Sequence, residues 1–161
     1  PGQWCHARVI TYLDENLVIL DRLWPVKHTD TYTKLRLHWL FDLEIEALND
    51  LPGMVDVDCQ THKLMFLCSN KNATFIDLKG SIEPFDGWIS RYYNSKTPTQ
   101  AMNYSTKSNQ ETWFVSIVTK SVSSPIVSLC SKYVEIDKST KLDLGIVRAS
   151  SNQMLAKMRL R

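Results

Sequence analysis

The amino-acid sequence predicts an all-β fold, a two-sheet antiparallel β-sandwich with a short C-terminal helix. Apolar and polar residues alternate with a period of two along most of the chain, whereas helical periodicity first appears in the last dozen residues. About nine short strand candidates are separated by turn-rich loops, a pattern typical of stacked sheets. A length of 161 residues suits one folded unit, so we expect residues 1–161 to form a single β-sandwich domain.

The N-terminal segment predicts a β-hairpin. Residues 8–13 and 17–23 are strand-like and flank a turn at residues 14–16. The second arm is apolar on both faces, which is typical of a strand in the middle of a sheet.

The clearest strand spans residues 31–41. The odd positions from 35 onward are apolar and the even positions up to 38 are polar, so one face is predicted to be buried and the other wet. The two sets are Leu35, Leu37, Trp39 and Phe41 against Tyr32, Lys34, Arg36 and His38. We therefore expect His38 to be a surface or hydrogen-bonded histidine.

Further strands follow from the same alternation. Residues 55–59 and 64–68 form a second predicted hairpin. The remaining candidates are residues 75–78, 113–118, 127–129, 133–136 and 142–147. The stretch from Gly80 to Thr112 is aromatic and poor in alternation, so it is expected to be a long loop. Ser151 and Asn152 could cap a short helix that runs to Leu160, and a frayed C-terminal tail is the alternative.

Composition limits the classes of partner. Hydrophobic residues make up 43% of the chain and charged residues 22%, and the net charge is only +2, so the chain is neither disordered nor typical of nucleic-acid binders. Apolar runs such as residues 17–20 are far shorter than the ~20 residues of a membrane span. We expect neither a nucleic-acid partner nor a membrane. The abrupt start at Pro1 suggests a piece of a longer chain.

The cysteines and histidines predict no metal or cofactor. The 4 cysteines include no C-x-x-C pair and no Cys/His cluster at zinc spacing. Cys59 and Cys68 flank a predicted turn, which leaves a cross-strand disulfide open, although two buried free thiols are favoured. His28 beside Asp30 would need further ligands from elsewhere to hold a metal.

Catalytic motifs are absent from the sequence. It contains no G-x-S-x-G elbow, no P-loop and no G-x-G-x-x-G. The acid pairs Asp56/Asp58 and Glu44/Glu46 could serve general acid–base chemistry, but alternating acids on a wet strand face are normally only solvated. We therefore predict no catalytic residue, and a self-sufficient enzyme is disfavoured.

Aromatic and basic residues gather between Phe85 and Tyr93. Sugars bind proteins by stacking on aromatic rings beside polar groups, so Trp88, Arg91 and Tyr92 are the candidate substrate-binding residues. The favoured alternative is that Trp88 and the tyrosines cover an open sheet edge with their rings buried. The segment is expected to be ordered and largely packed, in contrast to a mobile glycan-binding lid. Arg91 is the residue that could face a sugar carboxylate, although a surface salt bridge is favoured for it.

Three segments in order resemble the C-terminal β-sandwich of heparinase II/III-like polysaccharide lyases. The first runs from Ala7 to Tyr12 and continues into residues 17–23, and the second is Leu35-Arg36-Leu37-His38-Trp39. The third is the most specific: residues 80–84, then Gly87-Trp88-Ile89-Ser90-Arg91-Tyr92-Tyr93, which is similar to the family's Gly-Trp-x-Ser-x-x-Tyr stretch, and then Pro98. The resemblance covers about residues 4–120.

The resemblance implies a larger protein with an α/α toroid upstream of the sandwich and an oligosaccharide in the cleft between them. The implied reaction is β-elimination on a uronic acid, in a secreted or periplasmic enzyme. The family's toroid tyrosine and asparagine and its catalytic or metal-binding histidine segments have no counterpart in this sequence. No catalytic or metal role is therefore transferred to any residue.

Two functional hypotheses follow. The first is a non-catalytic C-terminal sandwich portion of such a lyase, with an acidic polysaccharide and the upstream toroid of the same parent chain as partners. The alternative is a free-standing carbohydrate-binding or adhesion module in which the loop carrying Trp88, Tyr92 and Tyr93 supplies the affinity.

Overall fold

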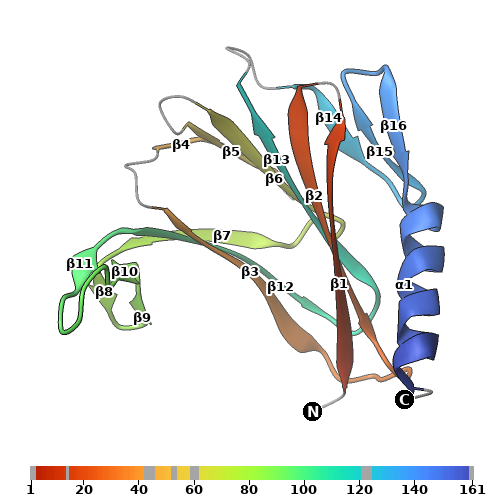
Figure 1. Ribbon diagram of the computed structural model, residues 1–161, viewed down its shortest axis with the longest axis horizontal. Coiled ribbons are helices and arrows are strands. Elements are labelled where there is room, and N and C mark those ends of the chain that lie inside the picture. Colours follow the sequence, from red (N-terminus) through yellow and green to blue (C-terminus); the bar gives the residue numbers. More distant parts are fainter. Residues whose placement is uncertain are drawn as a thin grey trace.

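The computed structural model describes residues 3–13, 15–41, 46–51, 54–58, 62–120 and 125–159. It is an all-β fold with one C-terminal helix, which confirms the predicted fold class. A six-stranded sheet forms the middle layer, and a three-stranded sheet runs across one of its faces (Figure 1). A small C-terminal sheet and the helix cover the other face.

The six-stranded sheet is antiparallel throughout. Its strands, in spatial order, are β1 (Trp4–Leu13), β2 (Asn16–Pro25), β13 (Thr112–Thr119), β6 (Lys63–Cys68), β5 (Met54–Asp58) and β4 (Glu46–Leu51). The two predicted hairpins, β1–β2 and β5–β6, are both confirmed. β2 lies between β1 and β13, as its apolar sequence predicted. Strand β4 was not predicted.

Strand β13 divides its side chains between two hydrophobic cores. Trp113, Val115 and Ile117 are buried on the side of the C-terminal layer. Phe114 is buried on the side of the three-stranded sheet, and Val118 packs beside it. Because successive side chains of a strand point to opposite faces, one strand serves both cores.

The three-stranded sheet consists of β3 (Thr33–Phe41), β12 (Gln100–Ser108) and β7 (Thr74–Lys79). Leu35 and Leu37 are each 5% exposed, whereas Arg36 and His38 lie on the outer face, which confirms the predicted register of β3. β12 lies inside the stretch that was expected to be a loop, so that expectation is wrong.

Strand β12 could not be recognised as a buried strand from its sequence, because several of its residues on both faces are polar. Asn103, Ser105, Thr106 and Ser108 are all at least nine-tenths buried. The strand pairs with β3 on one side and β7 on the other, so neighbouring strands shield even its polar positions. An alternation of apolar and polar residues therefore does not develop.

The C-terminal layer consists of β14 (Val127–Leu129), β15 (Tyr133–Ile136), β16 (Thr140–Asp143) and α1 (Leu144–Arg159). The strand predicted over residues 142–147 is wrong beyond Asp143, and the helix begins well before Ser151. Asp143 Oδ1 accepts a hydrogen bond of 2.6 Å from the Gly145 N–H, which caps the first turn. Leu144 and Val147 are buried at helical spacing, whereas Ile146 is 69% exposed.

The cysteines that the structure describes are free thiols. Cys68 is buried, Cys5 is half-buried and Cys130 is exposed, while Cys59 lies outside the described residues. Burial raises the pKa of the Cys68 thiol to about 11, so this thiol is protonated at neutral pH. In the described part of the chain, no helix combines the length and apolar character that crossing a membrane requires.

Candidate functional site

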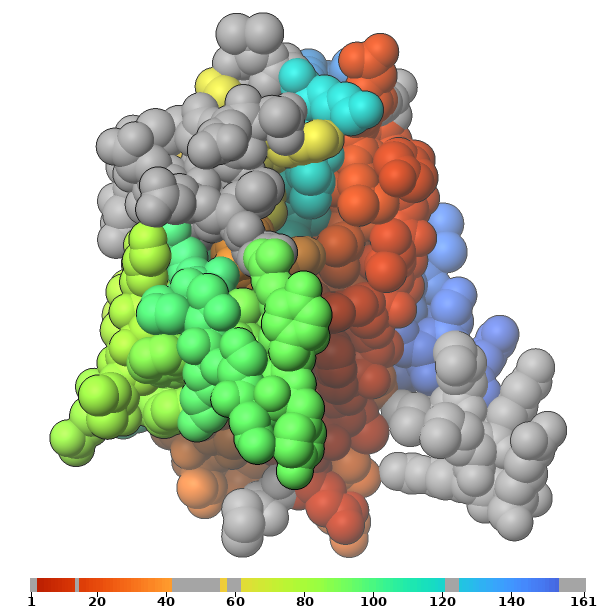
Figure 2. Space-filling view, turned by 60° about the vertical axis from the view of Figure 1, so that its left-hand side comes forward, coloured from red at the N-terminus to blue at the C-terminus, as the bar shows by residue number. Residues whose placement is uncertain are grey.

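Residues 81–98 form a small structured segment at one end of the three-stranded sheet (Figure 1). Its four short strands are β8 (Ser81–Ile82), β9 (Phe85–Asp86), β10 (Trp88–Ile89) and β11 (Thr97–Pro98), paired as β8 with β9 and β10 with β11. We call it the β8–β11 segment. In the space-filling view it stands out on the surface in green (Figure 2). The segment is thus ordered, as expected, but by strand pairing as well as by burial.

Gly87 fixes the centre of this segment. Its φ is +72°, and a Cβ built on it would lie 2.7 Å from Thr99 O and 2.8 Å from both Gly80 N and Leu78 O. The Gly87 carbonyl accepts hydrogen bonds from Gly80 N (3.0 Å) and Thr99 N (2.8 Å). Only a residue without a side chain permits this approach at this backbone angle.

Trp88 is half-buried against the rest of the segment. Its indole Nε1 donates a 2.8 Å hydrogen bond to the Ser81 carbonyl, the type of partner expected for a packed tryptophan. The ring stacks on Phe85 at 6.1 Å between centroids, with 9° between the planes. Phe85 is itself 62% exposed, so the stacked pair is accessible from solvent.

Asp86 attaches the segment to the outer face of the three-stranded sheet. Its carboxylate accepts hydrogen bonds from Asn103 Nδ2 at 2.8 Å and from the Gly87 N–H at 2.8 Å. His38 Nε2 lies 2.9 Å from the same carboxylate, and Arg36 lies 3.9 Å from it. The sequence prediction missed this cluster, although it placed His38 correctly on the polar face.

Two opposing effects act on the Asp86 carboxyl. Burial raises its pKa, because it disfavours the charged form. The hydrogen bonds from Asn103, His38 and the Gly87 N–H favour the carboxylate, and together they outweigh burial. The pKa of Asp86 is therefore below its ordinary value.

The loop between β10 and β11 is solvent-facing. Tyr92 is 76% and Tyr93 95% exposed, so the expectation that the tyrosines cover a sheet edge is wrong. The Tyr92 carbonyl accepts hydrogen bonds from Ser90 Oγ (2.9 Å) and Ser95 N (3.1 Å), which fix the loop. Arg91 is exposed in the same loop.

One basic residue completes this surface. Lys96 Nζ lies 4.8 Å from the centroid of the Phe85 ring, at a cation–π distance. We call the residues Phe85, Trp88, Arg91, Tyr92 and Lys96 the aromatic surface. It combines stacking rings with cations, which suits the binding of a planar or anionic group.

A second histidine–aspartate cluster lies across β1 and β2. His6 Nε2 is 2.6 Å and Arg8 Nε 2.7 Å from Asp21 Oδ1. Arg8 and Asp21 are direct partners in the strand register. The Asp21 side chain is only 2% exposed, so the Arg8 guanidinium compensates a buried charge and His6 supplies a further hydrogen-bonding partner. The cluster has a structural explanation.

The other predicted candidates do not come together as a site. His28 and Asp30 are exposed, and Asp56 is buried. The side chains of Asp58, Glu44 and Glu46 lie outside the described part of the structure. Within the described residues, no group of three or more metal-ligating side chains is close enough to hold a metal ion.

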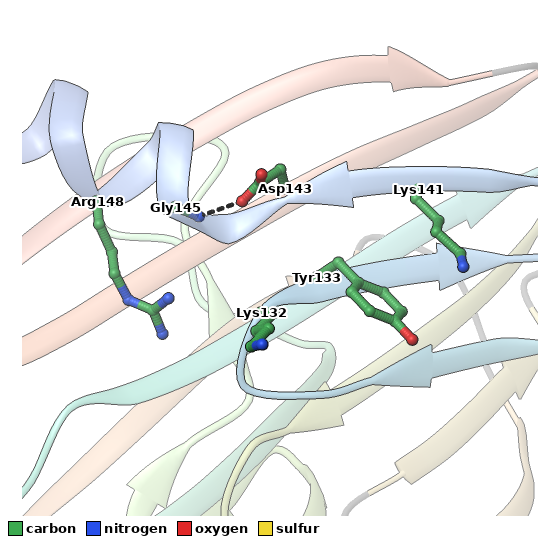
Figure 3. A pocket seen from close by; sticks show the side chains of 6 residues that line it. All are labelled: Lys132, Tyr133, Lys141, Asp143, Gly145 and Arg148. Atoms are coloured by element: carbon green, nitrogen blue, oxygen red, sulfur yellow. Dashed lines mark hydrogen bonds between the residues drawn. The ribbon is translucent and has the colours of Figure 1, made fainter.

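A hollow of about 370 Å³ lies where β15, β16 and the first turn of α1 meet (Figure 3). Its lining residues include Lys132, Lys141 and Arg148. Two of these cations are already engaged, Lys141 by Glu135 at 3.2 Å and Arg148 by Glu111 at 2.7 Å. We interpret the hollow as a packing gap between the helix and the C-terminal sheet, not as a binding site.

Comparison with family models and with curated proteins finds no match. Comparison with solved structures finds two polysaccharide lyases that share this fold. A heparinase III matches with a TM-score of 0.59 and 13% sequence identity, over 86% of this chain and 23% of that one. A heparan sulfate lyase HepC mutant from Pedobacter heparinus matches with a TM-score of 0.57 and 17% identity, over 86% of this chain and 24% of that one.

These matches bear on the fold. They agree with the heparinase-like sandwich fold that the sequence motifs suggested. The chain spans about a quarter of the length of each lyase.

Proposed function

We propose that this chain is the non-catalytic C-terminal β-sandwich portion of a heparinase II/III-like polysaccharide lyase. The parent enzyme would act on acidic, uronic-acid-containing glycans by β-elimination. The observation that carries the proposal is the shared fold, because 86% of the chain matches a portion of two such lyases. The order of the three sequence motifs supports the same relation.

The partners follow from this relation. An α/α toroid upstream in the same parent chain would supply the acid–base groups, since neither histidine–aspartate cluster needs a catalytic explanation. The sandwich would then support the toroid and border the substrate cleft. A secreted or periplasmic location is part of the same proposal, since acidic polysaccharides are extracellular polymers.

The aromatic surface is the proposed contact with the acidic polysaccharide. Phe85 and Trp88 offer a stacked pair of rings to the apolar face of a sugar. Arg91 can bind a carboxylate through two parallel hydrogen bonds, and Tyr92 adds an exposed ring in the same loop. Trp88, Arg91 and Tyr92 are therefore retained as the substrate-binding residues.

The first experiment tests the non-catalytic role. The purified chain is incubated with heparan sulfate, alginate and hyaluronan, and the absorbance of the unsaturated uronate product is followed. We expect no increase, whereas the same assay with a parent protein that includes the upstream region should show one. Product formation by this chain alone would contradict the proposal.

The second experiment tests the aromatic surface. Tyr92→Ala and Arg91→Gln should each weaken binding of a heparin oligosaccharide roughly three- to tenfold, because each removes one stacking or charge-assisted contact. Tyr12→Ala is the matched control, since Tyr12 is also 76% exposed but lies on β1. Equal losses for Tyr12→Ala and Tyr92→Ala would argue against a specific surface.

A free-standing carbohydrate-binding or adhesion module is the second candidate. The exposure of Tyr92 and Tyr93 favours it, because open aromatic rings can supply affinity without a toroid. The sequence upstream of Pro1 in the parent gene distinguishes the two candidates. A long α-helical region before Pro1 supports the lyase, and its absence supports the module.

A further inference from the structure

The outer face of the three-stranded sheet carries a groove of about 520 Å³. This volume lies within the range of small-molecule binding sites. Its lining includes Tyr32, Lys34, Asn72, Thr74, Ile76 and Lys107. We call it the sheet groove. It lies at the opposite end of β3 from Asp86, because Lys34 is four positions before His38, roughly 13 Å along the strand.

Two lysines face each other in this groove. Lys34 of β3 and Lys107 of β12 are direct partners in the antiparallel register, and both are exposed. Like charges at directly opposed positions destabilise a sheet. Neither lysine forms an ion pair with any residue that the structure describes, and the groove lining within the described residues contains no acid. An anion bound between the two ammonium groups would remove this repulsion.

The rest of the groove suits a sugar ring. Tyr32 is 65% and Ile76 47% exposed, so an apolar ring face and an apolar floor are available. Hydroxyl and amide groups lie beside them: Thr74 Oγ1 is 3.4 Å from Ser105 Oγ, and Asn72 is exposed at the rim. A ring to stack on, neighbouring hydrogen-bonding groups and two cations are the elements needed to bind a charged saccharide.

We propose that the sheet groove binds an anionic saccharide unit, with Lys34 and Lys107 on its carboxylate or sulfate and Tyr32 on its ring. This inference rests on the proposed function in one respect: the same acidic polysaccharide would occupy both the groove and the aromatic surface. The groove lies toward one end of β3, and the segment that carries the aromatic surface is attached toward the other end through Asp86 and His38. One oligosaccharide would therefore have to span much of β3 to occupy both.

The test is calorimetric titration of the full chain with a heparin-derived hexasaccharide. Lys34→Gln combined with Lys107→Gln should weaken binding roughly tenfold, since two charge-assisted contacts are lost. Lys120→Gln combined with Lys138→Gln removes the same net charge from exposed positions outside the groove, and it should change binding less than about twofold. Tyr32→Ala should also weaken binding, whereas Tyr12→Ala should not. Thermal melts confirm that each variant is folded.

Further ligands test which anionic group is bound, a carboxylate, a sulfate or a phosphate, and whether the ligand must be a saccharide. A polyuronate hexasaccharide without sulfate tests whether a carboxylate suffices, and an uncharged hexasaccharide should not bind. Stronger binding of a single-stranded oligonucleotide of equal charge would overturn the proposal in favour of a phosphate-backbone ligand.

The outcomes separate this inference from the proposed function. If both double-lysine variants weakened binding equally, the loss would reflect net charge alone, and the proposal that the sheet groove binds the saccharide would be wrong. If only Arg91→Gln and Tyr92→Ala lost affinity for the saccharide, the groove proposal would be wrong, but the proposed function would stand. If only the Lys34/Lys107 variant lost affinity, the groove would be the binding site and the aromatic surface would not be one. Absence of binding to every acidic oligosaccharide would overturn the groove, and the eliminase assay of the parent protein would then decide the proposed function.

Discussion

At the scale of single residues, backbone geometry at Gly87 decides how the β8–β11 segment folds. The residue combines a positive φ with three backbone atoms within 2.8 Å of a Cβ position. Each constraint alone would favour glycine, and together they exclude any other residue without movement of Leu78, Gly80 or Thr99. The family-like motif that begins at Gly87 therefore has a steric basis in this chain.

We predict that Gly87→Ala destabilises the protein. The backbone angle alone should cost ~1–3 kcal/mol, and the close contacts add to this cost. The control is Gly145→Ala, in the first turn of α1, where the nearest atom to a new Cβ is the Asp143 side chain at 2.9 Å. That change displaces the capping Asp143 carboxylate but replaces glycine by a better helix former, so the net effect should stay within about 1 kcal/mol. Urea midpoints measure both, and a neutral Gly87→Ala would show that the segment relaxes freely.

Asp86 gives a prediction about pH. Its folded-state pKa is lowered, so its stabilising contribution is complete above its unfolded pKa and is lost as pH falls through the folded pKa. The protein should therefore lose stability below about pH 4, and Asp86→Asn should lose less over the same interval. Urea unfolding at pH 7 and pH 3 measures the difference. The exposed Asp30→Asn is the control, and the prediction fails if Asp86→Asn retains the full acid dependence.

At the scale of elements, the sequence predicted strands whose two faces differ and missed those whose faces are alike. β3 was predicted from Leu35 and Leu37 against Arg36 and His38, and the structure confirms its register. β12 was missed because Asn103 and Ser105 are polar yet buried. The start of α1 was missed because Leu142, Leu144 and Ile146 also alternate with period two, and only the cap at Asp143 ends the strand.

The candidate site divides in the same way. The Trp88 indole bond to a carbonyl was predictable, because its partner Ser81 lies within the same short segment. The Asp86 cluster was not, because His38 is 48 positions away in the chain and only the pairing of β3 with β12 brings it near. Contacts of this kind depend on strand order, which period-two alternation does not specify.

Helix α1 is attached to the central sheet by a charged cluster as well as by its apolar residues. Glu111 accepts hydrogen bonds from Arg22 Nε at 2.8 Å, Arg148 Nε at 2.8 Å and Trp113 Nε1 at 2.9 Å. Burial raises the pKa of Glu111, but the bonds from Arg148, Trp113 and Arg22 outweigh burial and leave the pKa lowered. The Arg22 side chain is only 7% exposed, so the Glu111 carboxylate compensates a buried positive charge.

We predict that Glu111→Ala destabilises the protein by about 1–3 kcal/mol, because it leaves the buried Arg22 charge without its carboxylate. Amide exchange in α1 should accelerate, since Arg148 loses its ion pair with Glu111, the residue that precedes β13. Glu135→Ala is the control: its partner Lys141 is 55% exposed, and the loss should stay below about 1 kcal/mol. Equal losses in the two variants would mean that the Glu111 cluster adds no more than a surface ion pair.

At the scale of the whole molecule, the six-stranded sheet is the central layer, and each of its two faces contributes to one of the two hydrophobic cores. β2, β6 and β13 are buried on both faces, and β13 alone contributes Val115 to one core and Phe114 to the other. The three-stranded sheet packs on one face of this central sheet, and the C-terminal layer packs on the other (Figure 1). Loss of either outer layer would expose large apolar side chains of the same central strands, so the stability of the two cores should be coupled.

We therefore predict that the chain unfolds in one cooperative transition, as a single domain. Phe66→Ala in the core beside the three-stranded sheet and Leu20→Ala in the core beside α1 should each cost about 2–5 kcal/mol. Both side chains are at most 1% exposed. Each variant should shift one common transition, seen at the same midpoint by tryptophan fluorescence and far-ultraviolet circular dichroism. If Leu20→Ala instead produced a separate early transition of the helix signal, with the transition of the three-stranded sheet unchanged, the two cores would be independent and the single-domain proposal would be wrong.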